Sequence, residues 1–529
     1  MGFHPPLLLQ TVAGLQDFLN LARSQPQRVE SETIPVSVGF VPTMGALHAG
    51  HLSLIQRARQ ENQVVIVSIF VNPLQFGPSE DLANYPRDLE QDYRLCQEAG
   101  VDAVFAPTVA TLFAAGPPAT QVVPPVGMIA ELCGRSRPGH FQGVLTIVAK
   151  FLHLVQPQRV YFGQKDAQQL ALIRQMVTDL SFPVDVIACP IVREPSGLAC
   201  SSRNQYLTPA QHQQASILYR SLQAAEQLFL TGVRESEPLK QIVQETLSQS
   251  PEVQPEYVEL VDPATLVPLS AVEPQGLLAI AVRLGTTRLI DNLLLDARQP
   301  ILAIDGPAGV GKSTVTRQCA QILGLLHLDT GAMYRAATWL VLQANLDCQD
   351  RVAVAELIGQ AQIQLISDAN TPTGLRVQVN GQDVTEAIRS LEVTAHVSQI
   401  AAQPAVRQLL VQQQRRYGYK GGIAAEGRDI GTHVFPEAQL KIFLTASIQE
   451  RARRRYRELQ QQGITSLSLE QLEQDIQNRD YKDSHRAYAP LRRAIDAVEV
   501  NTDQLSVAEV IQRIVDLYRS RFPHCPPVV

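Results

Sequence analysis

Short apolar runs recur along this chain, and each of them ends in glycine or in polar residues. Val36–Val41, Val64–Val71 and Ile301–Ile304 have the length of buried strands. No apolar stretch approaches the roughly 18 residues that a membrane helix needs. Helix-compatible segments follow the first and the last of these runs, the first of them at Leu52–Arg59. This alternation of strands and helices predicts an α/β fold.

The run that ends at Ile304 leads into a glycine-rich loop. Residues 306–313, GPAGVGKS, fit the pattern G-x-x-x-x-G-K-[ST], which holds phosphates when it lies between a strand and a helix. Lys312 would reach the β- and γ-phosphates, and Ser313 would ligate Mg²⁺. We therefore expect an ATP site there, rather than a plain flexible turn. Its residues would be Gly306, Gly309, Gly311, Lys312, Ser313 and Thr314.

About 300 residues precede this loop, and they carry a second set of polar turns at predicted strand ends. In the first turn, PTMGALHAGH, a strand delivers His48 and His51 to the start of a helix. Imidazoles at a helix N-terminus are disfavoured from charging, so both are expected to be neutral N–H donors for phosphates. A structural role for either histidine is the alternative reading.

Three further turns follow the same rule, because ligands of open α/β sheets lie outside the carboxyl ends of the strands. Asn72 and Gln75 follow the strand Val64–Val71, and Gly163-Gln164-Lys165-Asp166 follows Arg159–Phe162. The turn at Cys200–Asn204 offers two hydroxyls and an arginine, which suits a phosphate clamp. Each could be an ordinary polar turn, but together they predict one nucleotide site.

The acidic residues Asp88, Glu90 and Asp92 are open to two readings. They could bind Mg²⁺, or they could form the solvated face of a helix. We assign no metal ligand in this half of the chain.

These segments resemble the motifs of a known family. PTMGALHAGH, SIFVNPLQFG, RPGHFQGVLTIV, GQKDAQQL and CSSRNQYL are similar to those of pantothenate synthetase (pantoate–β-alanine ligase), and the similarity runs from about residue 36 to Leu260, with a closing segment at 284–292. The resemblance implies that ATP activates pantoate as an acyl-adenylate with loss of pyrophosphate. β-Alanine then attacks to give pantothenate and AMP. It also implies a dimer through this half.

The same resemblance implies a fold and a set of site residues. A Rossmann-like nucleotidyltransferase domain would span residues 1–189, and a small α/β lid domain residues 190–295. His51 would be a proton donor with His48 beside it on the phosphates, Lys165 would meet phosphate, and Gln75 and Gln169 would bind pantoate. The residues implied to hold ATP are Met44, Gly45, Ala46, Leu47, His48, Ala49, Gly50, His51, Gly163, Gln164, Lys165, Asp166, Val192, Cys200, Ser201, Ser202 and Arg203.

Local signals agree with an α+β lid and a short connection. Thr208 is a predicted N-cap, Pro209 the first helical residue and Gly232 the position past the helix end. A second helix is expected over 237–248. Residues 296–300 form a tether without Gly/Ser-rich slack, so we expect the halves to touch or to hold a restricted orientation.

The second half carries further polar corners beyond the glycine-rich loop. LDTGAMYR (328–335) and EGRDIGT (426–432) each follow an apolar strand, and arginines are dense over 451–457. Such a helix is often a solvated surface or a nucleic-acid patch. Beside a phosphate-binding loop, a lid that closes on ATP and stabilises the transferring phosphoryl group is the better reading.

With IAIDGPAGVGKST, LDTGAMYRA, EGRDIGTHVFP and RDYKDSHRAYAPL, residues 300–517 resemble cytidylate kinase. The resemblance implies a P-loop nucleoside monophosphate kinase domain over 296–529, with an inserted substrate-binding domain at about 377–416, that transfers a phosphoryl group from MgATP to CMP or dCMP. Glu426 stands where the family commonly has Asp. The implied CMP-binding residues are Thr330, Tyr334, Arg335, Ser398, Arg407, Glu426, Arg428, Arg479, Asp483 and Arg486; Lys312 would be catalytic.

Composition and charge argue against nucleic acids and membranes as partners, and so favour small-molecule substrates. The net charge of −6 argues against a nucleic-acid binder, and the N-terminal residues MGFHPPLLLQ lack the basic and long apolar regions of a signal peptide. The seven cysteines fall singly, which favours reduced thiols in the cytoplasm and no membrane association.

Three alternatives stay open at this point. The kinase site could prefer UMP or another monophosphate, or one half could be a non-catalytic nucleotide-sensing module. RNA binding through the arginine helix is disfavoured by the acidic balance and by the lack of interleaved aromatic residues.

Overall fold

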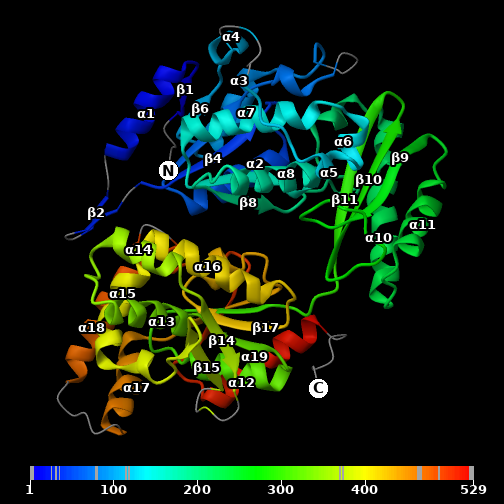
Figure 1. Cartoon of the computed structure of the whole chain (residues 1–529). Coiled ribbons are helices and arrows are strands. Elements are labelled where there is room, and N and C mark those ends of the chain that lie inside the picture. The colour runs from blue at the N-terminus through cyan, green and yellow to red at the C-terminus, as the bar shows by residue number, and fades with distance from the viewer. Residues whose placement is uncertain are drawn as a thin grey trace. The chain divides into compact units, whose positions relative to one another are not determined.

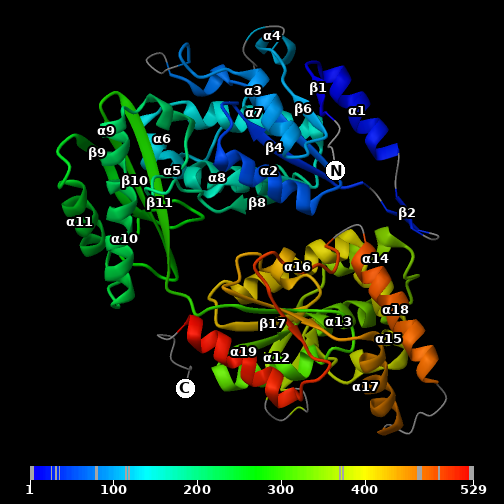
Figure 2. The same cartoon turned by 180° about the vertical axis from the view of Figure 1, so that it is seen from behind.

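The computed structural model describes residues 5–24, 27–29, 32–34, 36–77, 82–113, 116, 120–368, 371, 374–461, 468–486 and 489–522 (Figures 1 and 2). The chain forms two compact units, Met1–Ala297 and Arg298–Val529. Among the described residues, no helix combines the length and the apolar character that crossing a membrane requires. Parts of two quoted stretches, residues 1–4 and 487–488, lie outside the described residues, and so does Cys525.

The first unit is built on a six-stranded sheet in the order β1-β6-β5-β4-β7-β8, with all neighbouring strands parallel. The strands are β1 (Leu7–Leu9), β4 (Val38–Thr43), β5 (Val64–Ile69), β6 (Ala103–Phe105), β7 (Arg159–Gly163) and β8 (Asp185–Cys189). The chain moves outward from β4 through β5 to β6 and then returns to the other side of β4 with β7. The strand order therefore reverses between β4 and β7, which is where open α/β sheets bind their ligands.

Helices cover both faces of this sheet because apolar side chains leave it on both sides. One core joins the strands to α1 (Val12–Ser24), α7 (His140–Val155) and α8 (Ala167–Asp179). A second core joins them to α2 (Ala49–Glu61) and α3 (Leu89–Glu98). The shorter elements are β2 (Gln27–Val29), β3 (Glu32–Ile34), α4 (Val109–Leu112), α5 (Val126–Ile129) and α6 (Leu132–Ser136).

The same unit contains a second, antiparallel sheet in the order β11-β10-β9. It consists of β9 (Val253–Val261), β10 (Gln275–Leu284) and β11 (Thr287–Asp296), with α9 (Pro209–Ala215), α10 (Ile217–Leu230) and α11 (Ser236–Leu247) packed on it around a separate core (Figure 1). Thr208 caps α9 with a full capping box, as its sequence signal predicts. The single helix expected between Thr208 and Gly232 is instead two helices that meet at Ser216.

The second unit contains a five-stranded parallel sheet in the order β13-β17-β12-β18-β19. The strands are β12 (Leu302–Asp305), β13 (Leu326–Asp329), β17 (Ile423–Gly427), β18 (Leu440–Thr445) and β19 (Val498–Asn501). α12 (Lys312–Leu323) and α19 (Val507–Arg521) lie side by side and share one apolar core with the sheet (Figure 2). A larger core joins the sheet to α13 (Thr330–Gln343).

A small antiparallel sheet, β14-β15-β16, accompanies the second unit. It comprises β14 (Ile363–Ser367), β15 (Leu375–Val379) and β16 (Gln382–Asp383). The helices around it and beyond it are α14 (Arg351–Gly359), α15 (Leu391–Ala401), α16 (Pro404–Gly418), α17 (Ile448–Gln461) and α18 (Leu469–His485).

Candidate active sites

In the first unit, the predicted nucleotide residues lie at the carboxyl ends of β4, β5, β7 and β8, beside the reversal of strand order. The start of α2 reaches the turn that follows β8, because a Cβ added to Gly50 would lie 3.7 Å from the Cβ of Cys200. The charge of Lys165, from the turn after β7, acts on both His48 and His51. Segments more than 100 residues apart in the sequence are therefore gathered at one place.

The two histidines form a close pair at the N-terminus of α2, with ring centroids 4.1 Å apart and ring planes tilted by 40°. Nδ1 of His48 accepts the backbone N–H of Gly50 at 3.1 Å, which leaves Nε2 to carry the proton in the neutral ring. Burial, with the charge of Lys165, lowers the pKa of His48 to about 4. Burial, with the neighbouring His48, lowers the pKa of His51 to about 3. Both rings are neutral at physiological pH, and burial is the largest named cause.

Asp92 on α3 holds the loop that carries these histidines. Its carboxylate is 2% exposed and accepts the backbone N–H groups of Ala46 and Leu47 at 3.0 and 2.7 Å. Gly45 fits above it only because it lacks a side chain, since an added Cβ would lie 2.7 Å from the Asp92 carboxylate. Burial raises the pKa of Asp92, and the two backbone hydrogen bonds oppose that rise.

The other two acidic residues of the predicted cluster do different things. Asp88 is the N-cap of α3 and accepts the N–H of Gln91, while Glu90 forms an exposed ion pair with Arg94. Among the described residues, no group of three or more His, Cys, Asp or Glu side chains could hold a metal ion. The three carboxylates thus have separate partners, and they form neither one shared group of ligands nor a uniform solvated face.

The turn that carries Gln75 is held in place by the side chains of Asn72 and His140. The buried side chain of Asn72 donates to the carbonyl oxygen of Gly143 at 3.1 Å and to Oε1 of Gln75 at 3.1 Å. His140 Nδ1 lies 2.8 Å from the carbonyl oxygen of Gln75. Asn72 therefore anchors the turn. The side-chain NH₂ of Gln75 contacts the weakly accepting sulfur of Met44, so it can exchange this contact for one with a substrate.

The neighbouring glutamines of α8 have separate roles. Gln168 is buried and donates to the carbonyl oxygens of Met128 and Glu131. Gln169 is half-buried, and within the described part of the chain its side chain has no recorded hydrogen-bond partner. The structure thus leaves Gln169, the predicted pantoate ligand, with an uncommitted amide.

The antiparallel sheet supports this site through β11. Asn292 donates to the carbonyl oxygens of Gln164 and Lys165 at 3.0 and 2.8 Å. The buried carboxylate of Asp291 forms a two-point ion pair with Arg193, at 2.6 and 3.0 Å. Sequence reasoning assigned no role to either residue, because their partners lie about 100 residues or more away.

The predicted clamp closes one side of a small pocket. Ser201 caps the short helix that follows it by accepting the N–H of Arg203, and Cys200 donates its N–H to the carbonyl of Val192 at 2.9 Å. Ser202 Oγ lies 3.4 Å from the hydroxyl of Tyr85. The residues that line the pocket are Lys165, Leu198, Ala199, Ser201, Arg203, Asn204, Arg288, Leu289 and Ile290.

In the second unit, the glycine-rich loop joins β12 to α12 as its sequence predicts. Gly306, Gly309 and Gly311 have φ values of 155°, 78° and 88°, which favour glycine. Lys312 Nζ donates to the carbonyl oxygens of Gly306 and Pro307 at 2.8 and 2.7 Å. Burial, with the charge of Arg428, lowers the pKa of Lys312 well below its ordinary value.

Two arginines of α17 hold the same loop from outside. Arg451 is 3% exposed, donates to the carbonyl oxygen of Ala308 and pairs with Asp480 of α18. Arg454 reaches the carbonyl oxygen of Val310 at 3.5 Å. The arginine-dense helix therefore supports the loop backbone directly, a role that the sequence alone did not predict.

Glu426 lies beside Ser313 of the loop, not among the arginines of the predicted CMP site. Ser313 Oγ donates to Glu426 Oε2 at 2.7 Å, and His327 Nε2 lies 3.0 Å from Oε1. Burial would raise the pKa of Glu426, but the hydrogen bonds from His327 and Ser313 lower it. Thr330 is nearby and donates to the backbone carbonyl of Glu426.

A buried ion-pair network gathers three of the other predicted CMP residues. Asp429 accepts from Arg407 and from Arg486, the latter at 3.2 Å, and Arg407 lies over the ring of Tyr334. Burial would raise the pKa of Asp429, yet the two arginines lower it to about 2. Asp429 was missed in the sequence although it directly follows Arg428. The positive charge of the adjacent Arg428 was the signal in the sequence that could have pointed to Asp429.

Four more predicted residues lie close together at α18. Arg428 Nε donates to Asp483 at 2.8 Å. Burial, with the charge of Arg428, lowers the pKa of Arg479. The charge of Arg335 also acts on Arg479, whereas Ser398 is exposed on α15. The structure thus brings arginines from three elements together and leaves Ser398 at the surface.

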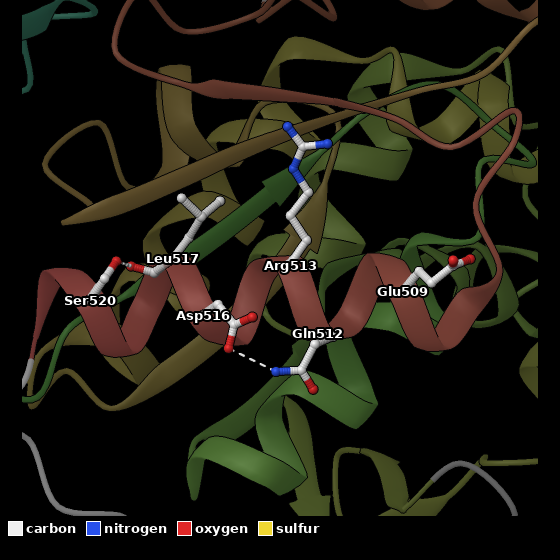
Figure 3. Close-up of a pocket in the computed structure, with 6 residues that line it drawn as sticks. All are labelled: Glu509, Gln512, Arg513, Asp516, Leu517 and Ser520. Atoms are coloured by element: carbon white, nitrogen blue, oxygen red, sulfur yellow. Dashed lines mark hydrogen bonds between the residues drawn. The ribbon is translucent and has the colours of Figure 1, made fainter.

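A shallow, open patch of surface lies elsewhere on the second unit, along α19 (Figure 3). All of its lining residues come from that one helix, and Gln512 donates to Asp516 across one turn. It offers none of the phosphate-binding groups described above, and we assign it no part in the chemistry.

Known proteins resemble this chain over its whole length. The family described as pantoate-beta-alanine ligase matches residues 8–294, and the family described as cytidylate kinase matches residues 302–520. A bifunctional pantoate ligase/cytidylate kinase of Trichormus variabilis is 57% identical over 531 residues, covering 97% of this chain and 99% of that protein. The protein of the same description from Thermosynechococcus vestitus is 59% identical over 517 residues, covering 97% and 98%. The crystal structure of pantothenate synthetase from Thermus thermophilus has 47% identity and a TM-score of 0.49, covering 54% of this chain and 98% of that one.

Proposed function

The chain belongs to the family of bifunctional pantoate ligases/cytidylate kinases, and from that premise we propose how its residues carry out two reactions. The first half condenses pantoate with β-alanine, and the second half phosphorylates CMP. Both halves would use ATP, which is attacked at its α-phosphorus in the ligase and at its γ-phosphorus in the kinase. The observation that carries the proposal is two separate sets of phosphate-binding groups, each at the carboxyl ends of its own parallel sheet.

In the ligase half, Met44–His51 and Gly163–Asp166 would hold ATP, while Gln75 and Gln169 would hold pantoate. His48 and His51 would donate hydrogen bonds as neutral rings, since their lowered pKa values mean that neither ring carries a second proton at neutral pH. Lys165 would supply the positive charge for the pentacoordinate α-phosphorus. Preorganised donors of this kind stabilise charge that develops in the transition state.

The turn at Cys200–Arg203 would close over the phosphates and exclude water from the pantoyl adenylate. Its attachment to the antiparallel sheet supports this idea, because Arg193 near the turn is paired with Asp291 of β11. We propose that residues 190–295 act as the lid of the nucleotide-binding domain of residues 1–189. Oligomerisation through this half and a cytoplasmic location stay predictions.

In the kinase half, Lys312 and the loop N–H groups would cradle ATP, and the arginines of α13, of the turn after β17 and of α18 would bind the phosphate of CMP. We propose that Asp429, rather than Glu426, lies on the CMP side, since it bonds to Arg407 and Arg486. The segment at 377–416 would be the inserted substrate-binding domain. The kinase would span 296–529 and the ligase 1–295, a division supported by the compact units that meet at Ala297 and Arg298.

The kinase site also fits Mg²⁺, which would neutralise charge on the transferred phosphoryl group when bound. Ser313 and Glu426 supply a hydroxyl and a carboxylate 2.7 Å apart, and Mg²⁺ prefers such hard oxygen donors. Mg²⁺ commonly uses only one or two protein ligands beside phosphates and water. We propose Ser313 as a direct ligand and Glu426 beside it.

A coupled assay of the purified chain tests the proposal. ATP, pantoate, β-alanine and CMP are supplied separately and together, and AMP, ADP, pantothenate and CDP are measured. Lys312→Ala is expected to abolish CDP formation and spare pantothenate synthesis, and His51→Ala to do the reverse. Loss of both activities from either change, or a preference for UMP over CMP, would contradict the assignment.

A further inference from the structure

Three side chains form a buried chain of hydrogen bonds at the edge of the kinase loop. Glu426 of β17 lies in the middle, with Ser313 of α12 on Oε2 and His327 of β13 on Oε1. Glu426 is 4% exposed, and the side chain of His327 is 12% exposed. Both carboxylate oxygens are therefore held, one from each side.

The partners of the His327 ring define its role. Nε2 lies 3.0 Å from a carboxylate oxygen, while Nδ1 is buried and has no hydrogen-bond partner among the described residues. A proton on Nδ1 would be buried without an acceptor, so the arrangement fits the neutral ring with its proton on Nε2. His327 thus acts as a hydrogen-bond donor to Glu426 through Nε2.

A glutamate at this place needs such a donor. Its side chain has several rotatable bonds, and ordering them costs conformational entropy. A second carboxylate, Asp329, lies at the end of the same strand as His327; burial raises its pKa, and the nearby charge of Glu426 raises it further. Without the His327 bond, the repulsion and the free rotation would both move Oε2 away from Ser313.

We infer that His327 is a positioning residue of the kinase site, which holds the Glu426 carboxylate against Ser313 and so shapes the binding place of the divalent cation of MgATP. The inference rests on the proposed function of Ser313 and Glu426. His327 touches neither substrate nor metal. It acts only through Glu426, as the hydrogen-bonding partners of metal ligands commonly do.

Two substitutions separate the hydrogen bond from the shape of the ring. His327→Leu fills similar space but removes the donor, whereas His327→Gln can place an amide N–H near the position of Nε2. Pantothenate synthesis by the same preparation reports on folding of the first unit only, and an unchanged KM for CMP reports on folding of the second unit. Ser313→Ala removes the proposed metal ligand itself.

Mn²⁺ binding, followed by electron paramagnetic resonance in the presence of the β,γ-imido analogue of ATP, gives a readout that does not depend on turnover. The ligase half also binds nucleotide under the proposed function, so the Mn²⁺ bound by Ser313→Ala protein is subtracted as background. We expect His327→Leu to weaken the remaining Mn²⁺ affinity about tenfold, the usual size of such effects, and His327→Gln to stay near the wild-type value. The Mg²⁺ concentration for half-maximal CDP formation should rise in parallel, with the KM for CMP unchanged.

The outcomes separate the inference from its premise. Wild-type Mn²⁺ affinity in His327→Leu, with weakened binding in Ser313→Ala, would overturn the inference alone. An equal loss in His327→Gln and His327→Leu would also overturn it, because the ring shape and not the hydrogen bond would then matter. Unchanged binding in Ser313→Ala would overturn the proposed metal site and the inference together.

Discussion

Asp92 gives the sharpest test of how the ligase half is built, because its carboxylate joins α3 to the loop that carries both histidines. In Asp92→Asn, one oxygen can still accept the N–H of Leu47, but the amide NH₂ must face the N–H of Ala46. A buried N–H without an acceptor costs about 1–3 kcal/mol. Burial also raises the pKa of Asp92, so the neutral amide regains part of the desolvation cost. We expect a net loss of about 1–2 kcal/mol in the free energy of unfolding.

The effect on activity should be much larger than the effect on stability. Two donors facing each other would push the loop away by a fraction of an ångström or more, and His48 and His51 would move with it. A displacement of about 1 Å can cost a hundredfold in rate. We therefore expect kcat/KM for pantothenate formation to fall about a hundredfold, with CDP formation unchanged in the same preparation. AMP release measures the ligase rate, ADP release measures the kinase rate, and urea unfolding measures the free energy of unfolding.

The neighbouring acidic residues provide matched controls. Asp88→Asn changes an exposed N-cap, and Glu90→Gln an exposed ion pair, so both should leave AMP release within about twofold of the wild-type rate. Had the three residues formed a metal site, all three changes would impair the ligase. Wild-type AMP release by Asp92→Asn would refute the reasoning, as would an equal loss in either control.

Three further predictions concern other parts of the two sites. His48 and His51 stay neutral in the folded protein down to pH values of about 4 and 3, whereas an unfolded histidine takes up its proton near pH 6.5. Their neutral rings therefore contribute to the free energy of unfolding above pH 6.5, and this contribution is lost as the pH falls. Urea unfolding should show a loss of about 2.5 kcal/mol between pH 7 and 5.5, and the loss should largely disappear when both residues are asparagine. Gly143→Ala should raise the KM for pantoate several-fold, because the added Cβ would lie 2.2 Å from the carbonyl oxygen of Leu74, while Gly127→Ala, with open space around it, should not. Asp429→Asn should raise the KM for CMP at least tenfold without changing pantothenate synthesis, since it leaves buried arginine charge unpaired.

Motifs that are contiguous in the sequence could be predicted because their geometry is local. The glycine-rich loop at 306–313 carries its own turn, lysine and helix start, and the structure places it between β12 and α12. The His48–His51 turn is local in the same way. Its two histidines are neutral as expected, and burial, which the local pattern does not show, contributes most to lowering their pKa values.

Contacts between distant segments could not be predicted from local pattern. Asp92 meets a loop more than 40 residues away, and His327 meets Glu426 across neighbouring strands about 100 residues apart in sequence. One signal was available for Asp92. It lies four residues before Cys96 on the buried stripe of α3, and a carboxylate on a buried stripe requires donors.

The two halves illustrate different solutions to binding the same nucleotide. In the ligase half the donors nearest the switch point of the sheet are neutral imidazoles, backbone N–H groups and Lys165, with Arg203 and Arg288 in the adjoining pocket. In the kinase half, arginines from three elements and a buried lysine face paired carboxylates. The proposed reactions account for the difference. Transfer of a doubly charged phosphoryl group onto a second phosphate brings like charges together, so cations must offset them. Attack by a carboxylate at the α-phosphorus, which carries pyrophosphate as its leaving group, is aided by directed neutral donors, which stabilise the transition state without binding the departing pyrophosphate so tightly that it stays.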